Sequence, residues 1–223
     1  SQPTNKEFYN KYNYLSTHFD SLIGIHLSNK MSGTWQNSLN AAKKVSEATE
    51  KRIDVINSNK LCNSLGLSVL RAARAIEDGM THDEVVANVP KWSNNTRIWV
   101  SARTMKYMVK SGRVSATKGL VGKLLNIKPV VVVNNDGKSE SFGKPFTMKQ
   151  SRKLVLDDLE KFIKGKKVWG YAISHAQNQK AADFFAEQLE KITGKKPEFV
   201  VNASPVLVTH VGNGVVAVGI MLD

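Results

Sequence analysis

The sequence predicts an α/β protein built from two halves, and three observations lead to this prediction. Short apolar runs typical of strands alternate with segments of helical periodicity along most of the 223 residues. The hydrophobic fraction of 41% and the charged fraction of 23% are those of an ordinary globular protein. Past the middle, an Asn-Asp-Gly hairpin signal interrupts the strand–helix alternation. We therefore expect a parallel α/β domain at 1–115, an α/β domain with a mixed sheet at 116–223, and a ligand cleft between them.

The expected strands are apolar runs rich in β-branched residues. They lie at Leu22–Leu27, Ile53–Ile56, Arg97–Val100, Ile127–Val133, Val168–Ile173, Phe199–Val201, Pro205–Val208 and Val215–Met221. The run before the hairpin signal "NNDG" and the "SESF" after it are expected to pair as neighbouring strands. The C-terminal segment "ASPVLVTHVGNGVVAVGIMLD" is expected to form a strand, a glycine turn and a second strand.

The expected helices have apolar residues at helical spacing and polar or glycine ends. "SLGLSVLRAARAIEDG" ends at Gly79, and "THDE" at Thr81–Glu84 is a capping box that opens the next helix. "KQSRKLVLDDLEKFIKG" and "NQKAADFFAEQLEKITG" predict two more helices, each ending at a glycine. The first of these four segments is expected to bury one apolar face, made of Leu65, Val69, Leu70, Ala73 and Ile76.

The positive charge of the chain is concentrated in one stretch. The net charge is +13, and residues 103–170 hold 16 Lys/Arg and 5 Asp/Glu, a balance of +11. Such a stretch suits nucleic acid, an anionic membrane surface or an acidic protein partner. Nucleic-acid binding is not favoured, because neither interleaved aromatic side chains nor a helix-turn-helix accompanies the charge. Without an apolar run near 18 residues the chain is not expected to be membrane-embedded, and the single Cys62 fits a reducing cytoplasm.

The stretch "LSNKMSGTW" joins an expected strand to an expected helix and collects hydrogen-bond donors. Ser28, Asn29, Ser32 and Thr34 contribute polar side chains, and Gly33 would let a ligand approach the backbone. The first N–H groups of a helix and its dipole favour an anion at this position, which predicts a carboxylate or phosphate site. The alternative is that Ser32 or Thr34 simply caps the helix.

Two further elements carry candidate functional residues. His210 precedes the turn that begins at Gly212, where backbone N–H groups are exposed, and Arg113 stands on a turn inside the basic stretch. The alternatives are a structural histidine and a solvated surface arginine. No zinc or two-metal spacing, Gly-x-Ser-x-Gly elbow or Walker loop is present. We expect no metal site and no catalytic residue of these conventional kinds.

Together these motifs resemble the DegV family nearly from end to end. "SQPT" is similar to the family's Thr-Ser-Gln-Pro-Ser/Thr segment, and "IGIHLSNKMSGTWQNSLNAA" to its I-x-I-x-x-S-S-x-L-S-G-T-Y-Q-S-A signature. "IDVINSNKLCNSLGLS" resembles V-I-D-S-x-x-x-S-x-G-x-G. "SGRVSATKGLVGKLLNIKPVV" resembles G-G-R-I-S-x-x-x-A-x-x-G-x-L-L-N-I-K-P-I-L, and "HVGNGVVAVG" resembles H-T-G-P-G-A-L-G. Any one match is modest, whereas five in register are specific.

The resemblance implies a DegV-like two-domain fold with a parallel, Rossmann-like N-terminal half and a mixed-sheet C-terminal half. It implies that a long-chain fatty acid such as palmitate, oleate or stearate lies between the domains, with no cofactor. The family's first strand has no counterpart, so the N-terminal domain is expected to be truncated and the natural protein to extend further. Its N-terminal motif places Ser1 and Gln2 near the site.

In that family the fatty-acid-binding subunit presents the ligand carboxylate to a separate ATP-dependent kinase, which makes an acyl phosphate. Carried over by motif, Ser28, Ser32 and Thr34 fall in the carboxylate-binding loop, His210 in the histidine motif, and Arg113 on the arginine that works with the kinase. Asn29 and Gly212 belong to the same two motifs. Four residues depart from the family pattern, which puts the chain-length preference and the simple fatty-acid ligand in question: Asn29, Asn57, Val211 and Asn213.

The leading hypothesis is thus a bacterial, cytoplasmic fatty-acid carrier without enzymatic activity of its own. The basic stretch at 103–170 would dock the kinase, and its charge also suits transient contact with an anionic membrane surface. The alternative is an enzyme that acts on a small phosphorylated or carboxylated substrate with His210 as general base. It predicts a shallow polar cleft instead of a deep apolar one. A third hypothesis, nucleic-acid binding, predicts steep salt dependence.

Overall fold

The computed structural model describes residues 2–114 and 127–223, and the strands of these residues form two sheets. Two strands form a small parallel sheet: β1 (Ser21–His26) and β2 (Arg52–Asn57). Six strands form a larger mixed sheet in the order β5-β4-β3-β8-β6-β7, in which only β6 and β7 are parallel. They are β3 (Thr96–Ser101), β4 (Val130–Val133), β5 (Ser139–Ser141), β6 (Val168–His175), β7 (Phe199–Asn202) and β8 (Val216–Leu222).

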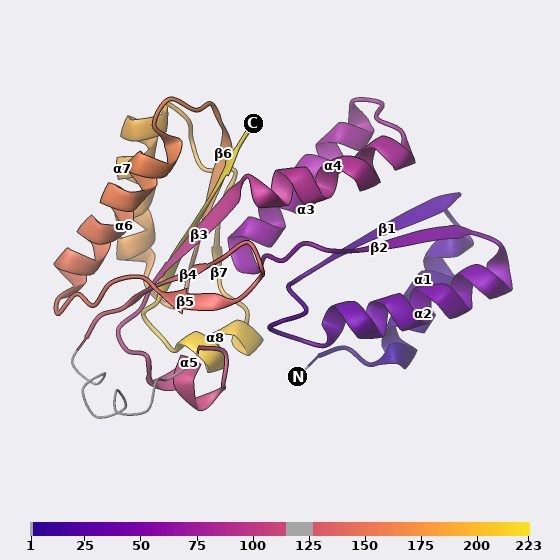
Figure 1. Ribbon diagram of the computed structural model, residues 1–223, viewed down its shortest axis with the longest axis horizontal. Helices are drawn as coiled ribbons and strands as arrows, with labels where there is room; N and C mark the ends of the chain where they lie inside the picture. Colours follow the sequence, from indigo (N-terminus) through magenta and orange to yellow (C-terminus); the bar gives the residue numbers. More distant parts are fainter. Residues whose placement is uncertain (1, 115–126) are drawn as a thin grey trace.

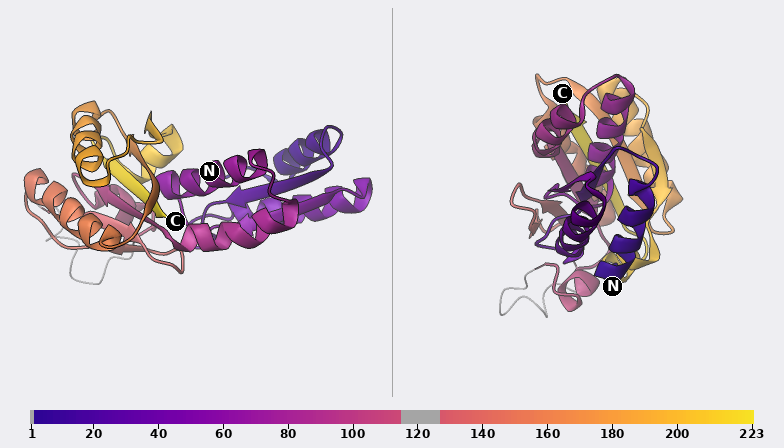
Figure 2. Two further views of the ribbon diagram at one scale, coloured as in Figure 1. Left: turned by 90° about the horizontal axis from the view of Figure 1, so that it is seen from above. Right: turned by 90° about the vertical axis from the view of Figure 1, so that its right-hand side faces the viewer.

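Eight helices of the described residues surround these sheets. They are α1 (Asn5–Ser16), α2 (Thr34–Thr49), α3 (Cys62–Glu77), α4 (His82–Asn94), α5 (Lys106–Lys110), α6 (Met148–Ile163), α7 (Gln179–Thr193) and α8 (Pro205–Val211). The molecule is elongated, with α1, α2 and the small sheet at one end and α6 and α7 at the other (Figures 1 and 2). None of the helices of residues 2–114 and 127–223 is long and apolar enough to cross a membrane.

The side chains of the larger sheet alternate between two different environments. On β3, Trp99 is fully buried among side chains of α6 and α7, whereas Ile98 and Val100 belong to a second cluster on the opposite face. On β4, Val131 and Val133 share that second face. Because successive side chains of a strand point to opposite faces, one face of the sheet is covered by α6 and α7, and the other is left for α3 and the ligand site.

Helix α3 lies between the two sheets and packs closely against the larger one. Its buried face is made of small and polar residues together with Leu67, not of the apolar face expected from the sequence. Val69 and Ile76 from that expected face are 43% and 53% exposed, so this prediction is wrong. Asn63 explains the difference, because its amide donates to the carbonyls of Ala172 and Ala217 in neighbouring strands. Small residues let the helix approach the sheet closely enough for these bonds.

The strand expected at Arg97–Val100 exists as β3, but it does not belong to a parallel N-terminal sheet. It pairs antiparallel with β4 and β8 inside the larger sheet. Local sequence predicts that a strand forms, whereas its partners are fixed by distant residues, so the membership of β3 was not predictable from its own residues. The division into domains at residue 115 therefore fails for this strand, and the boundary elsewhere stays a prediction.

The prediction of a strand at Pro205–Val208 is also wrong, because these residues begin helix α8. Ser204 is the N-cap, its hydroxyl accepts from the Leu207 N–H at 3.4 Å, and Pro205 occupies the first helical position. A serine followed by proline is a helix-start signal that outweighs the β-branched residues after it. Other local predictions are confirmed: β4 and β5 form the hairpin across "NNDG", and Thr81 and Glu84 form the capping box of α4.

Candidate functional site

A chamber of about 450 Å³ lies on the free face of the larger sheet, where α3 begins. Its floor is formed by Val100, Val131 and Val133 of β3 and β4. Residues from the N-terminal part of the chain complete it on one side: Pro3, Leu27, Met31, Leu61, Cys62 and Leu65. Residues around α5 and along α8 complete it on the other side: Met108, Val114, Val206, Leu207 and Val211. A partly open, mostly apolar cavity of this size is typical of a site for a small apolar ligand.

A few polar side chains interrupt the apolar lining, and most come from the segments that the sequence singled out. Ser32, Thr34, His210 and Arg113 all line the chamber. Ser32 and His210 are 178 positions apart in the sequence but face the same space. Two further lining hydroxyls were not predicted: Ser139 and Ser204. The "SP" helix-start signal could have drawn attention to Ser204, whereas nothing in the local sequence marks Ser139.

The loop between β1 and α2 is pinned by Ser28, which lies beneath the loop and not on the chamber wall. Ser28 is fully buried; its hydroxyl donates to the Gly137 carbonyl at 2.8 Å and accepts from the Lys30 N–H at 3.1 Å. Its own N–H donates to the Lys60 carbonyl at 2.8 Å. These bonds fasten the loop to the hairpin and to the start of α3. Ser28 therefore positions the loop, and its expected contact with a carboxylate has no support in this geometry.

Ser32 and Thr34 lie at the start of α2 with their hydroxyl oxygens 2.8 Å apart. The N-cap is Gly33, which makes no side-chain capping bond, but Ser32 Oγ accepts from the Thr34 N–H at 3.3 Å. The alternative that Ser32 helps to cap the helix is therefore supported in part. The Gly33 N–H donates to the Gln2 side-chain oxygen at 2.8 Å, and Ser32 Oγ lies 3.3 Å from the same oxygen. Gln2 thus contacts the start of α2 beside the chamber without lining it, while Ser1 lies outside the described residues.

Asn29 and Gly212, both expected at the site, do not line the chamber. Asn29 is exposed, and its backbone N–H donates to the Asn57 side chain at 3.3 Å. Gly212 ends α8 with a φ of 83° and packs under the ring of Tyr107, where an added Cβ would come within 2.5 Å of a ring carbon. Glycine is needed there for the backbone conformation and for the contact between α5 and α8.

His210 lies in the last turn of α8, not at the end of a strand as the sequence suggested. In the described part of the chain its Nδ1 is buried and has no hydrogen-bond partner. Burial lowers the pKa of His210 below its ordinary value, and the nearby Arg113 guanidinium lowers it further. The lowered pKa favours the neutral imidazole, whose buried Nδ1 is a polar atom left without a partner.

Arg113 lies just after α5, where the chamber meets a second basin of about 400 Å³. The two cavities share Met31, Arg113, Val114 and Ser139. The basin adds Lys30, Lys138 and one carboxylate, that of Glu140. The apolar chamber thus opens beside a polar basin with an excess of positive charge, which suits an anionic group at this end.

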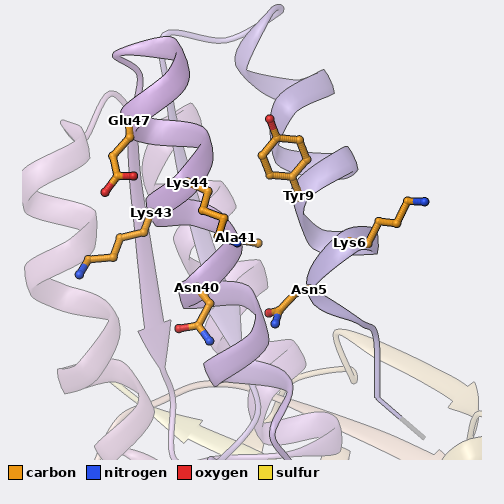
Figure 3. Close-up of a pocket in the computed structure, with 8 residues that line it drawn as sticks. All are labelled: Asn5, Lys6, Tyr9, Asn40, Ala41, Lys43, Lys44 and Glu47. Atoms are coloured by element: carbon orange, nitrogen blue, oxygen red, sulfur yellow. The ribbon is translucent and has the colours of Figure 1, made fainter.

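A larger open groove of about 720 Å³ lies between α1 and α2, but its polar groups do not converge (Figure 3). Lys6 points away from α2, and Lys43 points away from α1 (Figure 3). No apolar floor comparable to that of the chamber is present, since Ala41 and Tyr9 are the nonpolar contributors among its lining residues. In residues 2–114 and 127–223 no group of three His, Cys, Asp or Glu side chains could hold a metal ion. The chamber remains the best candidate site.

Comparison with known proteins gives matches over the whole chain. The family model described as "Uncharacterised protein, DegV family" matches residues 1–223. A DegV domain-containing protein of Staphylococcus aureus (strain N315) is 28% identical over 228 residues, which cover 100% of this chain and 77% of the relative. The crystal structure of a fatty acid binding DegV family protein from Streptococcus agalactiae matches with a TM-score of 0.86 at 25% identity, covering 100% of this chain and 78% of that one. A stearic acid-binding protein from Eubacterium ventriosum has the same fold, with a TM-score of 0.90 at 20% identity and coverage of 100% and 77%.

Proposed function

This chain belongs to the DegV family, and from that premise we propose that it binds a long-chain fatty acid in the apolar chamber. The observation that carries the proposal is the division of the chamber into apolar walls and a small polar group made by Ser32, Thr34, His210 and Arg113. Burial of an acyl chain contributes about 0.8 kcal/mol per methylene before the costs of association. The polar group then fixes the position of the carboxylate.

The chemistry of the polar group matches a carboxylate. Two hydroxyls can donate to its oxygens. The exposed guanidinium of Arg113 borders the basin and adds only a screened attraction for the carboxylate. Neutral His210 can donate from one ring nitrogen without adding a second buried charge. None of these groups needs to break a covalent bond. The chain would therefore hold and orient its ligand, as a carrier does.

We propose further that the bound carboxylate is presented to a separate ATP-dependent kinase for acyl phosphate formation. The position of Arg113 supports this step, because it borders both the chamber and the basic basin that contains Lys30 and Lys138. An acidic surface of a partner would find its complement there, and its association would weaken as salt rises. Two expectations from the sequence stay predictions: transient contact with an anionic membrane surface and a cytoplasmic location.

The alternative enzyme, with His210 as general base, gains some support from the lowered pKa and the free Nδ1. However, it predicts a shallow polar cleft, and most of the chamber lining is apolar. A small charged substrate would leave valine and leucine side chains without contacts. The geometry therefore favours the fatty acid.

Native mass spectrometry of the purified protein tests the proposal. We expect one co-purifying long-chain fatty acid per chain, which is released on denaturation and replaced when palmitate is added in excess. A protein that is empty, and that takes up no palmitate, would contradict the proposal. Turnover of a soluble phosphorylated substrate that is abolished by His210→Ala would support the enzyme in its place.

A further inference from the structure

The start of helix α2 already holds a polar group of the protein itself. The Gly33 N–H, which an anion at this helix end would use, donates instead to the Oε1 of Gln2 at 2.8 Å. Ser32 Oγ lies 3.3 Å from the same oxygen. The amide oxygen of Gln2 therefore occupies the position that a ligand oxygen would take if the backbone formed the cradle.

Gly33 has the shape that this contact requires. Its φ is −74°, so the backbone conformation does not demand glycine. A Cβ at this position would lie 2.6 Å from Gln2 Nε2 and 2.9 Å from Gln2 Oε1. The missing side chain of Gly33 thus makes room for Gln2, whereas the sequence suggested that it makes room for a ligand.

The segment around Gln2 is fastened on both sides. The Pro3 carbonyl accepts from the Asn37 side chain of α2 at 2.8 Å, and Thr4 forms the capping box that starts α1. Pro3 also lines the chamber. The amide of Gln2 is consequently held against the start of α2 by the neighbouring residues as well as by its own bonds.

We propose that Gln2 is a positioning residue for the ligand head group. By accepting from the Gly33 N–H and from Ser32, it engages the backbone donor beside the chamber and leaves the hydroxyls of Ser32 and Thr34, which line the chamber, to meet the carboxylate. In the empty site Ser32 donates to Gln2 Oε1, and on ligand binding the same hydroxyl turns to the carboxylate. This inference rests on the proposed fatty-acid binding and assigns a role that neither Gly33 nor the helix end can fill alone.

The test compares palmitate with hexadecanol, which has the same chain length and no charge. Gln2→Glu keeps the size of the side chain but places a negative charge beside Ser32, so palmitate affinity should fall about tenfold or more while hexadecanol affinity stays within about twofold. Gln2→Ala should weaken palmitate binding in the same selective way. Gly33→Ala displaces Gln2, so its effect should not add to that of Gln2→Ala.

Gln36→Ala is the matched control. Gln36 lies on α2, the helix whose start Gln2 contacts, and its side-chain amide bonds only Asn40 in the described residues. It should leave both affinities unchanged. Equal palmitate affinity in the wild type and both Gln2 variants would overturn the inference, and so would an equal loss of hexadecanol binding, which indicates a structural role. A wild-type protein that binds neither probe would instead refute the proposed function, so the two failures are distinguishable.

Discussion

The two polar walls of the chamber differ in how fully their hydrogen bonds are satisfied. On the β1–α2 wall, formed by Ser32, Thr34 and the loop before them, each polar group discussed has a partner within the protein. On the α5–α8 wall, formed by Arg113 and His210, the histidine Nδ1 has no partner in the described part of the chain. Among the same residues the Arg113 guanidinium donates only to the Ser111 carbonyl. The comparison teaches that the first wall is prearranged and must exchange an internal hydrogen bond to meet a ligand, while the second holds a polar atom that no described protein group satisfies.

The largest expected effect comes from placing a charge in the apolar lining between the two polar walls. Leu207→Asp puts a carboxylate on the chamber side of α8, where an acyl chain would remove it from water without a partner. We expect palmitate affinity to fall about 100-fold or more, measured by displacement of a fluorescent fatty acid. Thr209→Asp is the matched control, because Thr209 is exposed on the same helix. Unchanged binding by Leu207→Asp would show that the acyl chain lies elsewhere.

Arg113→Ala separates binding from presentation to the kinase. Because Arg113 is exposed at the junction of chamber and basin, we expect palmitate affinity to change by less than about threefold. Phosphorylation of the bound acid by the ATP-dependent component of a bacterial fatty acid kinase should slow by about tenfold or more. Lys161→Ala, an exposed change elsewhere in the basic stretch, should leave the rate unaltered. A normal phosphorylation rate with Arg113→Ala would show that this residue does not contribute to the interaction with the kinase.

Two serines of one loop sharpen the contrast between ligand contact and support. Ser32→Ala should lower palmitate affinity about tenfold, because a hydrogen bond to a charged group contributes about 1.5–3 kcal/mol and Thr34 replaces part of it. Ser28→Ala should instead lower the free energy of unfolding by about 1–3 kcal/mol, since it leaves the carbonyl of buried Gly137 and the partly buried Lys30 N–H without this hydroxyl. Calorimetry and binding assays on both variants check this. A loss of affinity with Ser28→Ala and a loss of stability with Ser32→Ala would show that Ser28 contacts the ligand and Ser32 supports the loop.

The smallest expected effect is a pH dependence that distinguishes the two walls. Burial lowers the pKa of His26, beneath the β1–α2 wall, and of His210. A histidine whose folded pKa lies below its unfolded value of about 6.5 stabilises the protein above that pH, and the contribution is lost as pH falls through the window below 6.5. Both residues should therefore add to acid destabilisation.

The ligand should affect only one of these histidines. His26 already bonds Ser38 at 2.6 Å, whereas His210 lines the chamber where a carboxylate is expected, and its Nδ1 has no partner among the described residues. In an NMR titration palmitate should raise the pKa of His210 and leave that of His26 unchanged, because only the former gains a nearby negative charge. Equal shifts of both residues would point to a general conformational effect.

Local signals in the sequence predicted most elements but not their long-range relations. The hairpin at "NNDG" and the capping box at Thr81 follow from the residues at those positions. Helix α8 was missed because Val206, Leu207 and Val208 resemble a strand, although Ser204 and Pro205 specify a helix start. The buried face of α3 was missed because close approach to the sheet selects small polar residues over large apolar ones.

The candidate site shows the same limit. The motifs pointed to Ser32, Thr34, His210 and Arg113, which the fold brings to one chamber from three separate parts of the sequence. They also pointed to Ser28 and Gly33, whose polar groups are engaged within the protein. A motif contains supporting residues as well as contact residues, and only the hydrogen-bond partners of each residue distinguish the two.

A crystal structure of the protein with palmitate tests the central claim most directly. We predict that the acyl chain fills the chamber over Val131 and Val133, with carboxylate oxygens within about 3.2 Å of the Ser32 or Thr34 hydroxyl and on the side of His210. Gln2 should still accept from the Gly33 N–H. A carboxylate that points to the opposite end of the chamber, or palmitate bound in the groove between α1 and α2, would contradict the account.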